Sequence, residues 1–176
     1  MLTDEQLARI MPRLPKTKRD LYLPRLNAAM REFGITTPAR RAAFLAQLAH
    51  ESAELRYMEE LASGAAYEGR RDLGNTHPGD GRRFKGRGPI QLTGRANYER
   101  YGRRLGVDLV GEPHRAAHPD VAFRVAACYW HDHGLNALAD AGRFAEITRR
   151  INGGQNGAAS RLRYFTRAKS VLTASA

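Results

Sequence analysis

The chain lacks the features that mark disulfide-stapled and membrane-spanning proteins. Its 176 residues include one cysteine, Cys128, so no intramolecular disulfide can form. Cys128 lies in an apolar stretch, where we expect a buried small side chain. The N-terminus shows no basic start or apolar core of a signal peptide, and the apolar runs are far shorter than a membrane span. We therefore expect synthesis in the cytoplasm.

Acidic residues are also scarce beside basic ones. The chain has 18 Asp and Glu against 29 Lys and Arg, a formal net charge of +11. Such a field attracts polyanions, including nucleic acids, acidic lipid surfaces and anionic cell-wall polymers, although solubility alone could also account for it. The hydrophobic content of 42% is ordinary for a globular protein. The length predicts a single domain over residues 1–176.

Apolar residues recur mostly at helical spacing. Thr3 and Gln6 form a capping box that begins a short helix. Thr37-Pro38 starts a longer one that carries an apolar stripe to Glu51. Further helical patterns cover about 26–33, 94–105, 119–133, 142–151 and 158–172, and the last has Leu162, Phe165 and Leu172 on its apolar side.

Residues 62–88 differ from the rest of the chain. Seven glycines and Pro78 fall in this segment, which predicts an irregular loop. A long loop in a compact domain is usually functional or disordered. We therefore expect a mainly α, single helical domain with a long Gly-rich loop that carries its function. Residues 1–36 could form an N-terminal helical accessory segment.

The stretch from His50 to Tyr98 holds the candidate reaction centre. Acidic clusters lie at Glu51 and at Glu59-Glu60, and a segment with the sequence Gly-Arg-Gly-Pro-Ile-Gln-Leu-Thr-Gly-Arg-Ala-Asn-Tyr follows at 86–98. Two carboxylates beside a Gly-rich polar segment are what a glycosidase requires.

The spacing of the carboxylates limits how they could act together. The apolar helix before Glu51 could desolvate its carboxyl group and raise its pKa, as a general acid needs. Inversion requires the second carboxylate roughly 6.5–9.5 Å away, and retention about 5–5.5 Å. A continuous helix would place Glu60 about 13.5 Å along the axis, so the helix must end or turn, as Ala62-Ser63-Gly64 favours. Alternatively, Glu54, Glu59 and Glu60 form a solvated face paired with Arg56.

Three polar side chains in the Gly-rich segment suit sugar and water binding. The hydroxyl of Thr93 can both donate to and accept from a water molecule. Gln91 and Asn97 can recognise sugar hydroxyls and N-acetyl groups. For each of them, an ordinary hydrogen bond to the loop backbone is the alternative.

These residues resemble glycoside hydrolase family 19, the chitinase-like lysozymes, and specifically the bacteriophage endolysin branch. The match is densest over residues 50–98 and weaker over 152–165. The resemblance implies a lysozyme-like helical domain with a catalytic cleft. It also implies inverting hydrolysis with Glu51 as general acid, Glu60 as general base and Thr93 placing the water, without metal or cofactor. Glu59 competes with Glu60, because a shift of one residue exchanges them.

The same resemblance implies a set of sugar-binding residues, namely His50, Gln91, Asn97, Asn152 and Arg161. Arg163 is a near alternative to Arg161. Asn156 stands where plant chitinases carry a further glutamate, and the plant enzymes' disulfides are absent. Both departures favour the phage lysozyme branch.

That branch implies hydrolysis of the β-1,4 bond between N-acetylmuramic acid and N-acetylglucosamine in peptidoglycan, for host cell lysis. Peptidoglycan carries carboxylates and the envelope carries phosphates, so both attract a chain of charge +11. We expect a monomer that waits in the host cytoplasm for release through a membrane pore. The alternative is a chitinase acting on N-acetylglucosamine polymers.

Two interpretations from other classes are weaker. A nucleic-acid-binding module would explain the charge and the pairs Arg82-Arg83 and Arg103-Arg104, but the chain has no recognised binding motif. A zinc site would need Cys128 with the histidines at 131 and 133, and His50-Glu51 lacks the second histidine of a zinc-protease helix. We therefore expect neither a nucleic-acid partner nor a metal.

Overall fold

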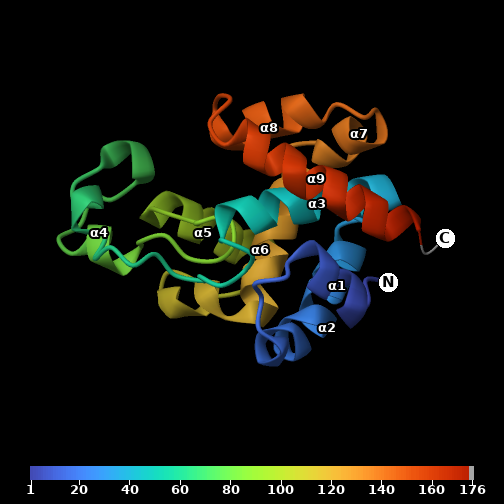
Figure 1. The fold of residues 1–176 in the computed structure, drawn as a ribbon. Coiled ribbons are helices and arrows are strands. Elements are labelled where there is room, and N and C mark those ends of the chain that lie inside the picture. The colour runs from blue at the N-terminus through green and yellow to red at the C-terminus, as the bar shows by residue number, and fades with distance from the viewer. Residues whose placement is uncertain (175–176) are drawn as a thin grey trace. The chain divides into compact units, whose positions relative to one another are not determined.

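The computed structural model describes residues 1–174, and these residues are mainly helical (Figure 1). The chain divides into two compact units, Met1–Arg56 with Ala127–Ala176, and Tyr57–Ala126. The described residues form no extended strand, only isolated bridges that pair Arg87 with Glu59 and with Leu92. None of their helices is long and apolar enough to cross a membrane. The prediction of a mainly helical fold is confirmed.

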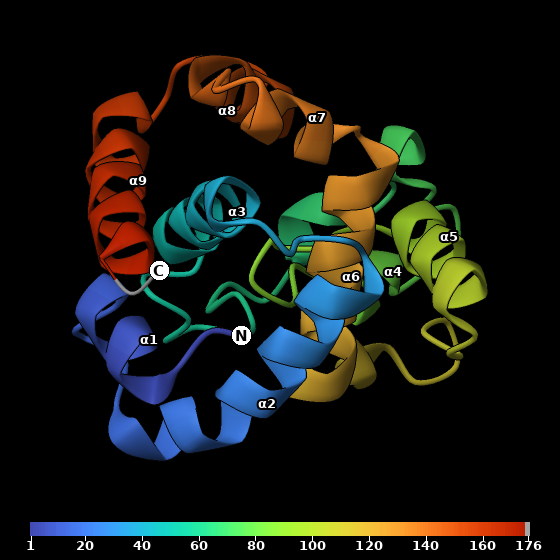
Figure 2. The same cartoon turned by 90° about the vertical axis from the view of Figure 1, so that its right-hand side faces the viewer.

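The first unit is built from six helices and the C-terminal end of a seventh, which crosses the unit boundary. They are α1 (Asp4–Ile10), α2 (Lys16–Glu32), α3 (Pro38–Glu51), α7 (Leu135–Asp140), α8 (Phe144–Asn152), α9 (Ala158–Thr173) and the shared α6 (Pro119–Asp132). Helix α3 lies beside α9 (Figure 2), and its residues 42–49 are all buried. Helix α3 is thus the core helix of this unit, and it delivers His50 and Glu51 at its C-terminal end.

Local signals fix where these helices begin and end. The Thr3 side chain accepts from the Gln6 backbone, and the Gln6 side chain accepts from Thr3, so the predicted capping box is present. Thr37 accepts from the Arg40 backbone and caps α3. Gly34 has a φ of 69° after α2, a conformation that glycine adopts without strain.

The predicted apolar side of α9 is wrong at Leu162. Its side chain is 54% exposed, whereas Arg161 beside it is buried. Phe165 stacks on Phe144 and Leu172 is buried, as expected. The helix turns Arg161 inward because this side chain finds charged and polar partners inside the unit. Helix α7 was not predicted from the sequence.

The second unit contains shorter elements, η1 (Ala65–Tyr67), η2 (Arg71–Leu73), α4 (Asp80–Arg83), α5 (Arg95–Leu105), η3 (Pro113–Ala117) and the first part of α6. The prediction of irregular structure over 62–88 is therefore wrong in part. Gly64, Gly74 and Gly79 flank the three short helices with φ of 72° to 87°. Three of the seven glycines that suggested a loop therefore act as helix boundaries.

A short antiparallel pairing joins the two segments that hold the second unit's candidate residues. The backbone of Glu60 donates to Gly86, and that of Gly88 donates to Met58. Arg87 and Leu92 exchange backbone hydrogen bonds in the same region. Glu60 is therefore fixed against the start of the Gly-rich segment.

Candidate active site

Helix α3 ends at Glu51, and the chain then turns sharply. Ala53, Glu54 and Leu55 have φ of 49°, 65° and 59°, three consecutive left-handed residues that are not glycine. The helix thus ends and turns before Glu60, as the two-carboxylate hypothesis requires, although much earlier than Ala62-Ser63-Gly64 suggested.

A buried relay of polar side chains holds the carboxylate of Glu51. Arg161 Nη2 donates to Glu51 Oε1 at 2.6 Å, and Arg161 Nη1 donates to Gln47 Oε1 at 2.5 Å. Gln47 Nε2 donates in turn to Thr148 Oγ1 at 3.0 Å. The side chain of Arg161 is 2% exposed and that of Glu51 is 26% exposed. The relay fixes one oxygen of Glu51 while part of the side chain stays accessible.

His50 lies next to Glu51 and packs on the loop that follows α8. A Cβ atom at Gly157 would lie 2.4 Å from His50 Nε2, so only glycine allows this approach. Burial lowers the pKa of His50, and the positive charges of Arg161 and Arg163 lower it further against the opposing effect of Glu51. In the same loop, Asn152 Nδ2 donates to the Asn156 carbonyl at 3.1 Å.

Glu54 is not on a solvated face with Arg56, so that alternative is wrong for this residue. Glu54 is 2% exposed. It accepts from the Arg13 backbone at 2.7 Å, from Arg13 Nε at 2.9 Å and from the Tyr164 hydroxyl at 2.8 Å. Burial raises the pKa of Glu54, but these hydrogen bonds outweigh it and leave the pKa below its ordinary value. Glu54 therefore ties the turn after α3 to α9.

Glu60 is held through one carboxylate oxygen. Oε2 accepts from the Tyr67 hydroxyl at 3.1 Å and from the Gly86 backbone at 3.0 Å. Oε1 is buried, and no group within residues 1–174 hydrogen-bonds to it. A carboxylate oriented by one oxygen, with the other unoccupied, can accept a proton from a bound water.

Glu59 has a different environment. Its carboxylate pairs with Lys85 Nζ at 3.1 Å and Arg87 Nη2 at 3.3 Å, and its side chain is 43% exposed. The Glu59 carboxylate is therefore engaged by two cations. Glu59 thus belongs to an ion-pair cluster with Lys85 and Arg87.

The polar residues of the Gly-rich segment are bound to its backbone, in line with the alternative raised from the sequence. Thr93 Oγ1 donates to the Gln91 carbonyl at 2.8 Å, and Asn97 Nδ2 donates to the Thr93 carbonyl at 2.8 Å. Gln91 has a φ of 54°, and its Nε2 donates to the Gly88 carbonyl at 3.0 Å. In each of these hydrogen bonds the side chain is the donor. The hydroxyl oxygen of Thr93 and the amide oxygens of Gln91 and Asn97 can therefore still accept hydrogen bonds.

Gly86 sits where the carboxylate and the Gly-rich segment meet. A Cβ atom there would lie 2.6 Å from Glu60 Oε2 and 2.7 Å from Gln91 Oε1. Only glycine permits this contact, because real Cβ atoms do not approach side-chain oxygens so closely. The glycine signal in the sequence thus marks a close approach between two candidate residues.

A further network supports Tyr67 and the start of α5. Asn75 Nδ2 donates to the Tyr67 carbonyl at 2.8 Å, and Asn75 Oδ1 accepts from the Arg95 backbone at 2.9 Å. The side chain of Arg95 binds both oxygens of Asp80, at 2.9 Å and 2.7 Å. This pairing, opposed by burial, lowers the pKa of Asp80 to about 2.

The structure gathers the predicted residues into one set in each unit. The first unit brings together His50, Glu51 and Arg161, with Asn152 in the loop that packs on His50, and the second brings together Glu60, Gln91, Thr93 and Asn97.

Sequence reasoning missed the residues that hold these sets in place. Gln47 carried a signal, since it is a polar residue inside an otherwise apolar helix stretch. Tyr67 and the group formed by Glu54, Arg13 and Tyr164 carried none, because their partners are distant in sequence or lie in an irregular segment.

The family model described as chitinase class I matches residues 33–161, and the chain belongs to glycoside hydrolase family 19. A family 19 domain-containing protein of Haemophilus influenzae is 30% identical over 171 residues, covering 80% of this chain and 84% of that protein. Endochitinase At2g43610 of Arabidopsis thaliana is 40% identical over 123 residues, covering 68% of this chain but 42% of that protein. The chain thus matches less than half the length of this plant relative.

A solved structure shows the same fold. Chitinase C from Streptomyces griseus HUT6037 matches with a TM-score of 0.80 and 27% identity, covering 98% of this chain and 76% of that one. The family resemblance inferred from the sequence is confirmed. The phage endolysin branch within the family stays a prediction.

Proposed function

We propose that the protein is a lysozyme-type glycoside hydrolase. It would cleave the β-1,4 bond between N-acetylmuramic acid and N-acetylglucosamine in peptidoglycan, with inversion, for host cell lysis. One observation supports assignment as a glycosidase most strongly. Oε2 of the Glu60 carboxylate is held by two hydrogen bonds, whereas Oε1 has no hydrogen-bond partner within residues 1–174. This is the state that a general base needs in a chain of family 19.

In the proposed reaction, Glu51 protonates the glycosidic oxygen as the bond to the anomeric carbon breaks. Glu60 takes a proton from a water that attacks the same carbon from the opposite face, which inverts its configuration. Thr93 accepts a hydrogen bond from that water, since its own proton goes to the Gln91 carbonyl. All the proton transfers use carboxyl groups of the chain, so the reaction requires no metal or cofactor.

The ion pairs of Glu59 support Glu60 as the base. The Glu59 carboxylate pairs with Lys85 and Arg87, whereas the Glu60 carboxylate accepts from two neutral donors, the Tyr67 hydroxyl and the Gly86 backbone. Glu59 is thus committed to two ion pairs, whereas Glu60 Oε1 has no partner within residues 1–174, and this contrast favours Glu60 as the base.

The predicted sugar-binding residues fall into two kinds. His50, Gln91, Asn97 and Asn152 retain polar atoms that can reach a sugar. Arg161 is buried and bonded to Glu51, so we assign it to the orientation of the acid rather than to direct sugar contact. The near alternative, Arg163, is exposed.

The charge of the chain favours peptidoglycan over chitin. Peptidoglycan carries carboxylates, so a net charge of +11 assists its binding. Chitin is neutral and gains no such assistance. The named relatives are chitinases, which makes hydrolysis of N-acetylglucosamine polymers the second candidate. We further propose a monomer that is made in the host cytoplasm, passes a membrane pore and is attracted to anionic envelope surfaces.

Digestion of purified peptidoglycan, with mass spectrometry of the new reducing ends, tests the proposal. The wild type should release muramic acid ends. Glu51→Gln and Glu60→Gln should each lower the rate by about 10²–10⁴-fold, as expected when a general acid or base is lost. Glu59→Gln is the matched control and should retain most activity.

Several outcomes would contradict these assignments. Glucosamine ends, or peptide cleavage without new reducing ends, would exclude a muramidase. Faster hydrolysis of chitin oligomers than of peptidoglycan would favour the second candidate function, a chitinase. If Glu60→Gln were active and Glu59→Gln inactive, the general base would be Glu59. Because Glu51→Gln leaves Arg161 without its charge partner, circular dichroism must first show that this variant is folded.

A further inference from the structure

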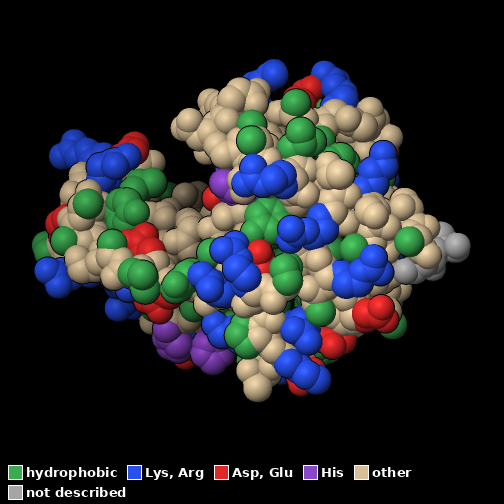
Figure 3. Space-filling model, in the orientation of Figure 1, with side chains coloured by type: hydrophobic (Ala, Val, Ile, Leu, Met, Phe, Trp, Pro, Cys, Tyr) green, Lys and Arg blue, Asp and Glu red, His purple; other side chains and the backbone are tan. Residues whose placement is uncertain are grey.

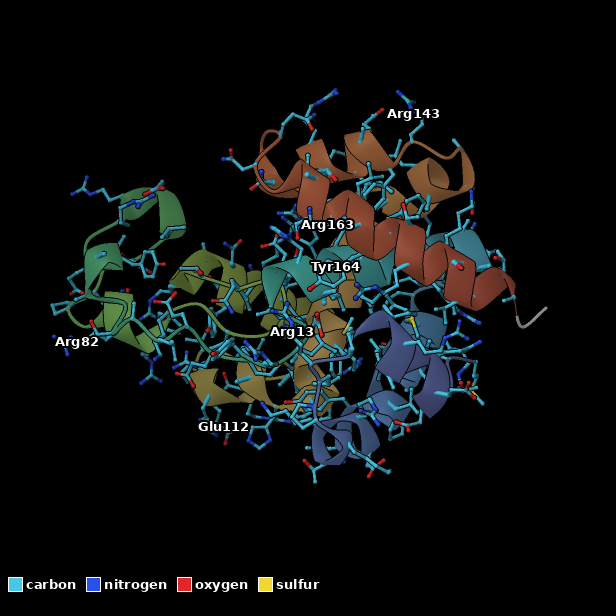
Figure 4. All side chains as sticks on the ribbon, viewed as in Figure 1. Arg13, Arg82, Glu112, Arg143, Arg163 and Tyr164 are labelled. Atoms are coloured by element: carbon cyan, nitrogen blue, oxygen red, sulfur yellow. The ribbon has the colours of Figure 1, made fainter. Side chains whose placement is uncertain are left out.

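A basic groove of about 360 Å³ lies in the first unit, outside the residues assigned to catalysis. Three segments form it, namely the one between α1 and α2, the turn after α3 and one face of α9. Its lining consists of Pro12, Arg13, Glu54, Ser160, Arg163, Tyr164 and Arg167. Figure 4 shows Arg13, Arg163 and Tyr164 on the same face of the molecule.

The groove has an excess of positive charge. Its one acidic side chain, Glu54, is buried and already bonded to Arg13 and Tyr164. Arg163 and Arg167 are exposed, and no carboxylate within residues 1–174 pairs with either of them. Three arginines and one glutamate give the lining a net charge of +2, so the groove suits an anionic ligand.

The arginines are placed to act together. Arg163 and Arg167 stand four residues apart on α9, where side chains of neighbouring turns lie about 5–6 Å apart. The guanidinium of Arg167 lies over the Tyr164 ring at 5.7 Å from its centroid. Glu54 and the Tyr164 hydroxyl hold the guanidinium of Arg13. Guanidinium groups presented in this way bind carboxylates through paired hydrogen bonds.

Helix α9 connects this groove to the candidate acid. Arg161 of α9 binds Glu51 inside the unit, and Arg163, two residues later, is exposed and acts electrostatically on His50. Figure 3 shows Lys and Arg side chains gathered over the face that α9 presents. A substrate held at His50 and Glu51 would therefore bring its neighbouring substituents to Arg163.

We propose that the groove binds the carboxylates of the stem peptide carried by muramic acid. This inference rests on the proposed function, because the peptide branches from the sugar next to the bond to be cut. The peptide of peptidoglycan carries several carboxylates, whereas chitin has no such substituent. The groove would thus make the enzyme prefer peptide-bearing glycan.

Binding of a soluble disaccharide-peptide from peptidoglycan, compared with the same disaccharide without its peptide, tests the groove directly. The double variant Arg163→Gln/Arg167→Gln should weaken binding of the peptide form by about tenfold and leave the peptide-free form unchanged. Arg25→Gln/Arg31→Gln, which removes the same charge from exposed positions of α2, is the matched control and should change both by less than about twofold.

Hydrolysis gives a second measurement. On intact peptidoglycan the groove variant should raise KM with kcat unchanged, since the groove holds the substrate without touching the reacting atoms. On glycan strands stripped of peptide by an amidase, it should match the wild type. Equal losses on both substrates, or no change on either, would overturn the inference.

The remaining outcomes separate this inference from the proposed function. A wild type that releases no muramic acid ends would contradict the proposed function. The binding titration would still show whether the groove binds the stem peptide. If the groove variant lost binding to phosphatidylglycerol vesicles but not to the disaccharide-peptide, the arginines would serve a lipid surface, and the inference would be wrong.

Discussion

The two oxygens of the Glu60 carboxylate have different surroundings, and this difference suits the residue to proton transfer. Oε2 accepts from Tyr67 and Gly86, which fixes the plane of the carboxylate. Oε1 is buried without a partner among the described residues, a costly arrangement unless a ligand or water completes it. The sequence located this carboxylate but could not predict Tyr67, which lies in a segment without periodicity.

Gly86→Ala tests whether this geometry matters. The added Cβ would lie within 2.7 Å of both Glu60 Oε2 and Gln91 Oε1, so the carboxylate must move. We expect kcat on peptidoglycan to fall by about tenfold or more, with an overpacking cost of about 1–3 kcal/mol. Gly154→Ala is the control, since Gly154 does not have a positive φ and a Cβ there meets nothing within 4 Å among the described residues. Wild-type turnover by Gly86→Ala would show that the contact is dispensable.

His50 should make stability depend on pH. Its pKa is lowered in the folded chain, mainly by burial and then by Arg161, so the unfolded chain takes up a proton more readily. Stability should therefore fall as the pH drops below about 6.5, toward the lowered pKa of the folded state. His50→Gln should reduce this dependence in melting curves recorded from about pH 8 to about pH 5. An unchanged slope would assign the effect to other groups.

At the scale of the elements, the sequence predicted helices that have local signals. The capping box at Thr3 and the Thr37-Pro38 start each act within one turn, so their effect can be read from neighbouring residues. Helix α7 is only six residues long, which gives too short a pattern for a period to be recognised. The face of α9 was misjudged at Leu162 because Arg161 is drawn inward by Glu51, a partner 110 residues away.

Asp80→Asn should destabilise the second unit. Asp80 begins α4, is buried, and binds Arg95 through both oxygens. With Arg95 pairing as the main cause, the pKa of Asp80 is lowered to about 2, which corresponds to about 2 kcal/mol of stability. This contribution is present above pH 3.8 and is lost as the pH falls toward about 2.

Urea unfolding of wild type and Asp80→Asn measures this contribution. The variant should lose about 2 kcal/mol at neutral pH and show a shallower loss of stability between about pH 4 and about pH 2. Asp72→Asn provides a control, because Asp72 pairs with Arg70 on the surface, with side chains 60% and 50% exposed. Equal effects of the two substitutions would exclude the buried pair as the cause.

At the scale of the whole molecule, family membership could be predicted from one short motif, whereas the substrate could not. The Gly-rich segment places Gly86 between Glu60 and Gln91, so its sequence is tightly constrained by local contacts. Net charge is spread over many residues, and in our proposal it favours peptidoglycan over neutral chitin.

Ionic strength should therefore distinguish the two substrates. Raising NaCl from about 0.1 M to about 1 M shortens the Debye length from about 10 Å to about 3 Å. We expect the rate on peptidoglycan to fall by about tenfold and the rate on chitin oligomers to change by less than about twofold, because chitin has no charge to screen. Initial rates on both substrates with one enzyme preparation measure this. Equal salt dependence would remove the electrostatic argument for peptidoglycan.

The left-handed turn after α3 leaves room for engineering heat tolerance. Ala53, Glu54 and Leu55 all adopt positive φ, at a cost of roughly 1 kcal/mol each. Glu54 and Leu55 are buried and must keep their side chains, but Ala53 is partly exposed. Ala53→Asn should raise the melting temperature by about 2 °C, because asparagine tolerates this conformation without the entropy of glycine. If calorimetry showed a lower melting temperature for Ala53→Asn, alanine would not be strained in this turn.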